Sequence, residues 1–393
     1  MRIAIFSDSW FPYVSGVVNS IDTFRDELGK QGHEVFIFAP SYRDQEPEAG
    51  VFRFPALPAP TNSGFALALP FAPRVGRLLR ELAVDIVHCH SPFLLGGVGA
   101  RWARHLRIPL VFTHHTLYDL YTHYVPLFPG LAKRAVLGFA RRFCNGCDLV
   151  ITPTRVVAER LDRLGVTAPL RAIPTGVKLH EFQGTDPKWL RTRLGIPDSE
   201  KIILCVARLG REKNLELVLR SFSLIQRKVP DSHLVLVGLG PLRDELARQA
   251  AESGLGNRVH FLDRVLTRQE IANCYAGADL FLFASVTETQ GMIVNEAQAA
   301  GLPVVAVRAF GVAEMVDEGE DGFLTEPEAE SLAGAAVSVL TDGELRARLQ
   351  EGARRAALCI SSEAVARELA LTYRELVDGK LVVPARGVTA EVD

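Results

Sequence analysis

Two glutamates, Glu288 and Glu296, stand with seven residues between them, and a Thr-Gln-Gly turn follows the first. The apolar run at residues 280–284 precedes the pair and predicts a buried parallel strand. Good helix formers follow at residues 293–300, and a glycine and a proline end the run. The pattern places Glu288 on the loop at the carboxyl end of a strand and Glu296 inside the next helix.

This edge of a parallel α/β sheet is where ligands bind. The backbone N–H groups at the start of the expected helix would point toward an anion, such as a diphosphate, bound there. These groups belong to Thr289, Gln290, Gly291, Met292 and Ile293. The alternative is a pair of solvated glutamates at the start of a surface helix.

A strand expected at residues 201–207 delivers Arg208 and Lys213 to the same edge. Two cations there suit a diphosphate leaving group, because its departure develops negative charge that must be neutralised. Gly238 lies in a Gly-x-Gly turn after the next strand, at residues 233–237. Taken alone, an arginine and a lysine at this spacing are typical of a solvated surface, and a Gly-x-Gly is typical of a tight turn.

Strands and helices alternate along the chain in two successive series, which indicates βαβ units and mostly parallel sheets. The expected strands cover residues 3–6, 34–38, 85–88, 109–112 and 148–151 in the first half, and 201–207, 233–237, 259–262, 279–283 and 304–307 in the second. Proline and glycine interrupt the pattern near Thr175, where we expect a hinge. We therefore expect domains at residues 1–174 and 175–360, followed by a helix and a frayed tail at 361–393.

The composition fits a two-domain globular protein, because 393 residues exceed what one core usually supports. The net charge of −2 gives no global attraction to nucleic acid. Cys144 and Cys147 have the spacing of a redox pair or half a zinc site, but no second pair completes it. Scattered free thiols, with no signal peptide and no transmembrane run, lead us to expect a cytoplasmic protein.

The first half adds two candidate segments. Gly16 lies in a loop between the first strand and the first helix, where backbone amides could approach donor phosphates. His114 and His115 follow the strand at residues 109–112; adjacent histidines can hold a metal, but no ligand spacing completes such a site. The absence of a G-x-G-x-x-G sequence argues against a dinucleotide oxidoreductase.

Residues 131–143 mix apolar side chains and cations at helical spacing, which predicts a basic amphipathic helix suited to anionic lipid head groups. The cations are Lys133, Arg134, Arg141 and Arg142, and the segment 73–82 adds Arg74, Arg77 and Arg80. The alternative is a surface helix whose apolar side packs on the sheet. One apolar face of a helix cannot both contact a membrane and pack on the sheet.

The paired glutamates, the two cations and the F-x-x-H-T pattern that ends at Thr116 resemble the retaining nucleotide-sugar glycosyltransferases of family 4. That resemblance implies an α/β fold of the GT-B type, in which two doubly wound Rossmann-like domains face a central cleft. It implies that Arg208 and Lys213 clamp the pyrophosphate, that Glu296 accepts hydrogen bonds from the ribose, and that Glu288 contacts the donor sugar.

The same resemblance implies that His115 looks toward the transferred sugar. Arg264 would lie where the base is held, largely through backbone groups, and Gly16 would approach the phosphates from the first domain. The implied catalytic residues are His115, Glu288, Arg208 and Lys213. No metal and no cofactor beyond the nucleotide sugar are implied.

The sequences T-H-H-T-L-Y at 113–118 and Y-T-H-Y-V-P at 121–126 narrow the resemblance to diacylglycerol glucosyltransferases. We accordingly expect transfer of a hexose, glucose in particular, from a UDP- or GDP-sugar to diacylglycerol, by an enzyme on the inner face of the cell membrane. The alternatives are a mannosyltransferase acting on phosphatidylinositol, a transferase with a soluble acceptor, a GT-B epimerase or phosphorylase, and a non-catalytic nucleotide-sugar-binding protein. The residues identify neither the base nor the sugar.

Overall fold

The computed structural model describes residues 1–43, 45–59, 64–70, 73–117 and 129–380, with the backbone alone for residues 129–133. The chain forms two compact units. Unit 1 comprises Met1–Pro153, Ala158–Ile173 and the chain from Val365 onward, and unit 2 comprises Thr154–Val157 and Pro174–Ala364. The two main boundaries between the units therefore follow Ile173 and Ala364. The sequence pattern placed these boundaries after residues 174 and 360.

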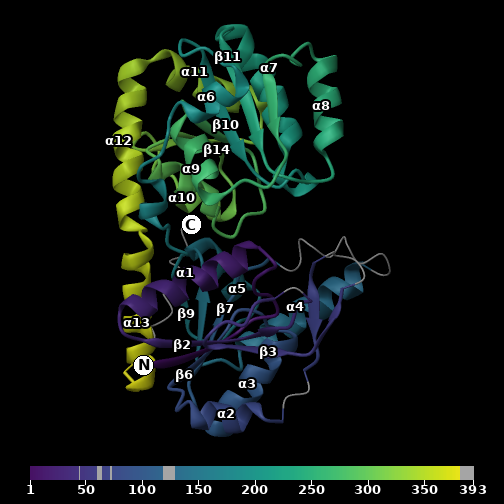
Figure 1. The fold of residues 1–393 in the computed structure, drawn as a ribbon, viewed down its shortest axis with the longest axis vertical. Helices are drawn as coiled ribbons and strands as arrows, with labels where there is room; N and C mark the ends of the chain where they lie inside the picture. Colours follow the sequence, from purple (N-terminus) through teal and green to yellow (C-terminus); the bar gives the residue numbers. More distant parts are fainter. Residues whose placement is uncertain (44, 60–63, 71–72, 118–128, 381–393) are drawn as a thin grey trace, which may run out of the picture. The chain divides into compact units, whose positions relative to one another are not determined.

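Unit 1 is built on a seven-stranded parallel sheet with the order β3-β2-β1-β6-β7-β8-β9 (Figure 1). Its strands are β1 (Arg2–Phe6), β2 (Glu34–Pro40), β3 (Val51–Phe54), β6 (Ile86–Cys89), β7 (Leu110–Thr113), β8 (Leu149–Thr152) and β9 (Leu170–Ala172), and a separate hairpin joins β4 (Ala56–Pro58) to β5 (Ala66–Ala68). The strands β6, β7 and β8 are buried along their whole length, as expected for apolar strands covered on both faces. The strand order reverses between β1 and β6, which is the switch point of this sheet.

Helices cover both faces of the unit 1 sheet. They are α1 (Gly16–Lys30), α2 (Val75–Glu81), α3 (Leu94–Leu106), α4 (Pro129–Cys144), α5 (Arg155–Arg163) and α13 (Ser362–Val377), of which α5 and α13 begin in segments of unit 2. Helix α1 starts where Ser15 accepts a hydrogen bond from the backbone N–H of Val18 at 3.3 Å, an N-cap. Helix α13 packs Leu369 and Tyr373 against the strand residues Ile3 and Ile5, so the end of the chain completes the core of unit 1.

Unit 2 contains a six-stranded parallel sheet with the order β12-β11-β10-β13-β14-β15 (Figure 1). Its strands are β10 (Lys201–Val206), β11 (Ser232–Val237), β12 (Val259–Leu262), β13 (Leu280–Phe283), β14 (Val304–Val307) and β15 (Gly322–Thr325). Its helices are η3 (Leu179–Phe182), α6 (Trp189–Leu194), η4 (Arg211–Lys213), α7 (Leu215–Lys228), α8 (Arg243–Glu252), α9 (Arg268–Ala276), α10 (Met292–Ala299), η5 (Phe310–Glu314), α11 (Ala329–Thr341) and α12 (Gly343–Cys359). The strand order reverses between β10 and β13, so ligands of this sheet are expected at the carboxyl ends of these two strands.

The two doubly wound parallel sheets confirm the α/β fold class that the sequence predicts. Every strand expected from the apolar runs is present within one or two residues at each end. The expectation missed β3, β9 and β15, which are all edge strands, and the β4–β5 hairpin. Among the residues that the structure describes, no helix combines the length and apolar composition needed to cross a bilayer.

Candidate active site

Lys213 and Glu288 meet at the switch point of unit 2. Lys213 follows β10 and Glu288 follows β13, and these two strands are the neighbours between which the strand order reverses. The ammonium nitrogen of Lys213 lies 2.5 Å from Oε1 of Glu288, and each side chain is 19% exposed. The structure therefore brings a cation and a carboxylate from the sequence prediction into direct contact, at the sheet edge where an α/β protein binds its ligand.

Ser285 fixes the position of the Glu288 carboxylate. The buried Ser285 hydroxyl lies 2.8 Å from Oε1 of Glu288 and 3.3 Å from the carbonyl oxygen of Glu212. The hydroxyl of Thr287 also lies 3.4 Å from that carbonyl. These contacts join the loop after β13 to the loop after β10. Hydrogen bonds of Ser285 and Thr287, in addition to the ion pair itself, therefore keep Lys213 and Glu288 close together.

Arg208 lies at the same edge but is far more exposed. Its side chain is 60% exposed, and its Nη1 is 3.3 Å from Oε1 of Glu212. The Glu212 side chain is 14% exposed, so only the cation of the pair stands in water. An ion pair with an exposed cation contributes little to stability, because water and salt screen it. The guanidinium can therefore leave Glu212 for a diphosphate at small cost.

Gln290 turns its side chain into the protein. Its Oε1 accepts the backbone N–H of Thr175 at 2.8 Å, and its Nε2 donates to the Thr175 carbonyl at 2.8 Å and to Oδ1 of Asn295 at 3.0 Å. What Gln290 can offer to a ligand is its backbone N–H. Its side chain instead links the Thr-Gln-Gly turn to Thr175, near the start of the main segment of unit 2.

Two glycines shape the backbone around this turn. Gly291 has φ of +88° and immediately precedes α10, so the helix begins without a capping side chain. A Cβ at Gly311 would lie 2.1 Å from the carbonyl oxygen of Thr289. The loop after β14 therefore packs backbone to backbone against the turn, and the half-buried Met292 and Ile293 open the helix. This arrangement leaves the first amides of α10 for an anion.

Glu296 is paired with a residue that the sequence did not single out. The hydroxyl of Tyr275, on α9, donates to Oε2 of Glu296 at 2.9 Å. Burial raises the pKa of Glu296, and the hydrogen bond from Tyr275 opposes that rise. A carboxylate held in this way accepts hydrogen bonds only, which suits a vicinal diol.

Gly238 and Arg264 shape the far side of the same edge. Gly238 has φ of +143°, and a Cβ there would lie 2.0 Å from the carbonyl oxygen of Ala207, so only glycine lets the two loops approach this closely. The guanidinium of Arg264 lies 2.5 Å from a carboxylate oxygen of Glu270 in α9. This ion pair, above all, lowers the pKa of Glu270 to about 2. Any contact of Arg264 with a base would then come from its backbone.

His115 belongs to a histidine cluster in unit 1. Its Nε2 lies 2.7 Å from Nδ1 of His90, and the two rings stack. Next to them, His88 bonds through one nitrogen to the Thr113 hydroxyl at 2.7 Å and through the other to the Tyr373 hydroxyl at 2.5 Å. Burial, above all, and the neighbouring His114 together lower the pKa of His115 to about 3, so the imidazole is neutral at pH 7.

Gly16 also lies in unit 1, in the first turn of α1, and a Cβ at this position would meet nothing within 4 Å. The loop after β1 carries Asp8, whose carboxylate accepts hydrogen bonds from the Ser91 hydroxyl at 2.6 Å and the Leu95 backbone N–H at 2.7 Å. Burial raises the pKa of Asp8. Asp8 thus joins the loops at the switch point of the unit 1 sheet and caps α3.

The basic helix predicted at residues 131–143 is α4. Its Phe143 and Cys144 are buried in the sheet core, while Arg134, Arg141 and Arg142 are exposed. A hollow of about 650 Å³ lies beside it, and its described lining is Arg104, Phe139, Arg141, Arg142, Phe143, Asn145 and Gly146. Arg104, on α3, is an addition to the predicted cations. The Lys133 side chain and the Y-T-H-Y-V-P sequence at 121–126 lie outside the described residues.

Cys144 and Cys147 are buried free thiols, and the Cys147 thiol donates to the Phe143 carbonyl at 3.3 Å. Burial raises the pKa of Cys144 to about 12. Within the described part of the chain, no group of three or more histidine, cysteine, aspartate or glutamate side chains has the arrangement needed to hold a metal ion.

The chain matches two family models, one for each half. Residues 14–181 match "Glycosyltransferase Family 4", and residues 188–356 match "Glycosyl transferases group 1". A structure of Anabaena HepE in complex with UDP superposes with a TM-score of 0.77 over 95% of this chain and 100% of that one, at 23% identity. The fold is therefore GT-B, and the protein belongs to glycosyltransferase family 4.

Relatives with assigned activities align with most of the chain. The alpha-monoglucosyldiacylglycerol synthase of Streptococcus pneumoniae is 35% identical over 78% of this chain and 71% of its own length. The enzyme of the same name from Acholeplasma laidlawii is 32% identical over 96% and 98%. A GDP-mannose-dependent alpha-mannosyltransferase of Corynebacterium glutamicum is 30% identical over 100% and 94%. The protein is thus a nucleotide-sugar-dependent hexosyltransferase.

Sequence reasoning missed the residues that hold the predicted ones in place. Ser285 could have been noticed, because it stands three residues before Glu288 on the same loop. Tyr275 could not, because it lies on a different helix from Glu296, which it contacts. The contact of His90 with His115 could have been inferred, because both residues follow neighbouring parallel strands, β6 and β7. Arg104 is separated from the α4 arginines in sequence and joins them only through the packing of α3 and α4.

Proposed function

We propose that the protein transfers glucose from a nucleotide diphosphate sugar to the hydroxyl of diacylglycerol, with retention of the anomeric configuration. The observation that carries this proposal is the Lys213–Glu288 contact at the switch point of unit 2, supported by Ser285. A diphosphate bound at this edge would have Lys213 and Arg208 as counter-charges and the first amides of α10 as donors.

The donor is held by unit 2 in this proposal. Glu296 receives the ribose hydroxyls, and Glu288 contacts the donor sugar. The loops at Gly238 and Arg264 hold the base through backbone groups. Positive charge from the protein stabilises the leaving diphosphate, so the reaction needs no metal ion.

The acceptor hydroxyl attacks the anomeric carbon on the face from which the diphosphate leaves, and the departing diphosphate takes the proton. His115 is neutral at pH 7 and is assigned to the side of the transferred sugar. Its bond to His90 fixes the orientation of its ring. No covalent nucleophile is assigned.

The acceptor is a membrane lipid in this proposal. Arg141 and Arg142 of α4 and Arg104 of α3 line one hollow, and a cluster of this kind attracts an anionic head group. The buried Phe143 and Cys144 hold the inner side of α4 on the sheet, which leaves the outer side for the membrane. The enzyme would then work as a peripheral protein on the cytoplasmic face of the membrane. The lipid acceptor in this proposal agrees with the names of two relatives, which are alpha-monoglucosyldiacylglycerol synthases.

The test is a matrix of donors and acceptors with the purified protein. UDP-glucose, UDP-galactose, GDP-mannose and GDP-glucose are each offered with diacylglycerol, phosphatidylinositol and a soluble polyol, and the product is analysed by mass spectrometry and by NMR of the anomeric proton. An α-glucosyl diacylglycerol is the expected product. A mannosylated phosphatidylinositol or a glycosylated polyol would replace the proposal, and donor binding without any product would indicate a non-catalytic binder.

A further inference from the structure

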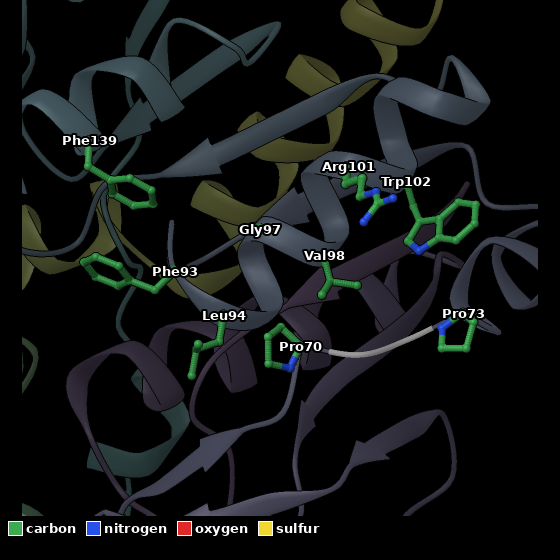
Figure 2. A pocket seen from close by; sticks show the side chains of 9 residues that line it. All are labelled: Pro70, Pro73, Phe93, Leu94, Gly97, Val98, Arg101, Trp102 and Phe139. Atoms are coloured by element: carbon green, nitrogen blue, oxygen red, sulfur yellow. The ribbon is translucent and has the colours of Figure 1, made fainter.

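Unit 1 contains an apolar cavity beside α3 that the site described above does not use (Figure 2). Its volume is about 690 Å³, and its described lining consists of Pro70, Pro73, Phe93, Leu94, Gly97, Val98, Arg101, Trp102 and Phe139. This volume lies within the range of about 300–1,000 Å³ that is usual for pockets that bind small molecules. Arg101 is the one charged residue among these nine, so the cavity suits a mostly hydrocarbon ligand.

Two stacked phenylalanines stand at one end of the cavity. The rings of Phe93 and Phe139 face each other with centroids 5.5 Å apart and an angle of 6° between their planes (Figure 2). Their side chains are 42% and 46% exposed, although both are large and apolar. Exposed aromatic side chains from two separate elements, next to an apolar cavity, mark a place where a hydrophobic ligand enters.

Trp102 forms a fixed wall at the opposite end of the lining. Gly76 of α2 approaches it so closely that a Cβ at Gly76 would lie 2.2 Å from the indole ring. Gly97 lines the cavity between these two ends, and a Cβ there would meet nothing within 4 Å. The helix surface at Gly97 therefore leaves room for a ligand to lie along α3.

One residue that lines the cavity is close in sequence to the histidine pair of the candidate site. His90, which contacts His115, follows β6 directly, and Phe93 comes only three residues later on the same β6–α3 connection. Asp8 anchors this connection by accepting the Ser91 hydroxyl and the Leu95 N–H. A lipid whose hydroxyl lies near His115 would have the mouth of the cavity within reach of its chains.

We propose that this cavity binds one fatty acyl chain of the lipid acceptor. The inference rests on the proposed function, because it takes the bound acyl chain to belong to diacylglycerol and not to a phospholipid of the surrounding membrane. The mostly apolar lining, with Arg101 as its one charged residue, supports this choice. The cationic hollow at Arg104, Arg141 and Arg142 is a separate feature, and among the described lining residues it shares only Phe139 with the cavity.

Trp102 provides a direct test of occupancy, because bromine atoms on an acyl chain quench the fluorescence of a tryptophan that they contact. The full-length protein in detergent micelles is titrated with diacylglycerol that carries bromine on its acyl chains, and with the same lipid without bromine. The expected result is quenching by the brominated lipid only. Because the chain has three tryptophans, Trp102→Phe identifies the source: the quenched component should vanish in this variant.

Gly97→Leu fills the cavity from inside. Leucine suits a helix better than glycine does, and the position is open, so the fold should tolerate the change. We expect the affinity for the brominated lipid to fall at least about tenfold, the effect of excluding a few methylene groups. The KM for long-chain diacylglycerol should rise, and the KM for a short-chain analogue should change less. Gly29→Leu, at an exposed and equally open position of α1, is the matched control and should behave as the parent does.

The outcomes separate this inference from the proposed function. Diacylglycerol that is glycosylated without quenching Trp102, or binding that Gly97→Leu leaves unchanged, would overturn the cavity assignment and leave the function standing. Equal quenching by a brominated phosphatidylglycerol would overturn the assignment to the acceptor. Failure of the function itself appears in the product analysis, as sugar on another acceptor, and is independent of the fluorescence.

Discussion

Lys213 and Glu288 are 75 residues apart in sequence, and their charged groups are 2.5 Å apart in space. Each comes from the loop after one of the two strands between which the sheet order of unit 2 reverses. The pair keeps a cation in place at the ligand edge before any ligand arrives. A diphosphate that enters then finds positive charge already oriented, which is the condition under which charge contributes most to catalysis.

We expect Lys213→Ala and Arg208→Ala each to lower kcat by at least about 100-fold, the range found when a preorganised charge at a transition state is removed. Initial rates at saturating donor and acceptor measure the effect. Arg220→Ala, which removes an exposed cation from α7, is the control and should retain activity. Parent-like turnover in either site variant would remove that residue from the pyrophosphate clamp.

Catalysis should proceed without added metal, because Arg208 and Lys213 supply the charge that a metal would otherwise bring to the diphosphate. The measurement is the rate of sugar transfer after dialysis against EDTA, with and without Mg²⁺ or Mn²⁺. Rates that agree within error are expected. Activity that disappears with EDTA and returns with a divalent ion would contradict the proposal.

The α4 cluster should bind the protein to anionic membranes. Replacing Lys133, Arg134, Arg141 and Arg142 together by alanine should abolish binding to anionic liposomes, because each cation near such a surface contributes about 1 kcal/mol. Sedimentation with liposomes of graded anionic content, at low and high salt, measures this. Donor binding should not change, since the donor contacts are assigned mainly to unit 2 and none is assigned to α4.

The control for the membrane experiment must have the same net charge as the variant with four alanines in α4. Alanine at the exposed Arg193, Arg220, Arg227 and Lys228 of unit 2 also removes four charges, which takes the formal net charge from −2 to −6 in both variants. Equal liposome binding by the two variants would show that net charge, and not the α4 surface, governs binding. No binding by the parent at any lipid composition would favour a soluble acceptor.

Asp321 should make the stability of unit 2 depend on pH. Its buried carboxylate accepts hydrogen bonds from the Asp317 N–H at 2.9 Å and from Nε2 of Gln298 at 3.0 Å, and burial raises its pKa to about 7. In the unfolded chain an aspartate has a pKa of about 3.9, so the folded state keeps a proton that the unfolded state loses between these values. The free energy of unfolding should therefore fall as the pH rises from about 4 to about 7, by up to about 1.4 kcal/mol per pH unit.

Urea unfolding of the parent and of Asp321→Asn across this pH window tests the assignment. The free energy of unfolding of the parent minus that of Asp321→Asn should decline with rising pH and level off above pH 7, because asparagine carries no ionisable proton. Asp198→Asn, at an exposed position, should show the same pH dependence as the parent. Parallel curves for the parent and Asp321→Asn would assign the proton to another group.

The sequence predicts the central strands of the two large sheets and the edge strand β12, but it misses their other three edge strands. Strands such as β13 and β14 are buried on both faces, and each is a continuous apolar run. The missed strands β3, β9 and β15 are edge strands with partly exposed residues, so the apolar signal is diluted. Their places are set by pairing with a neighbour, which a local pattern does not contain.

The same distinction applies to the candidate site. Because the loops that follow parallel strands share one edge of the sheet, the placement of Arg208, Lys213 and Glu288 could be inferred from two separate strand patterns. The bond from Tyr275 to Glu296 depends on how α9 packs against α10, and the Phe93–Phe139 stack depends on how α4 lies beside the start of α3. These contacts are tertiary and have no local sequence signature.

The return of α13 to the core of unit 1 has a consequence for synthesis on the ribosome. Tyr373 bonds to the buried His88 across 285 residues, and Leu369 packs on the first strand, so unit 1 lacks part of its core until almost the whole described chain has been made. Except for the short segment Thr154–Val157, unit 2 is one continuous stretch and emerges complete before that point. The half of the protein that is translated first is therefore the half that finishes folding last, and until then its exposed apolar strand faces are the part of the nascent chain most in need of protection.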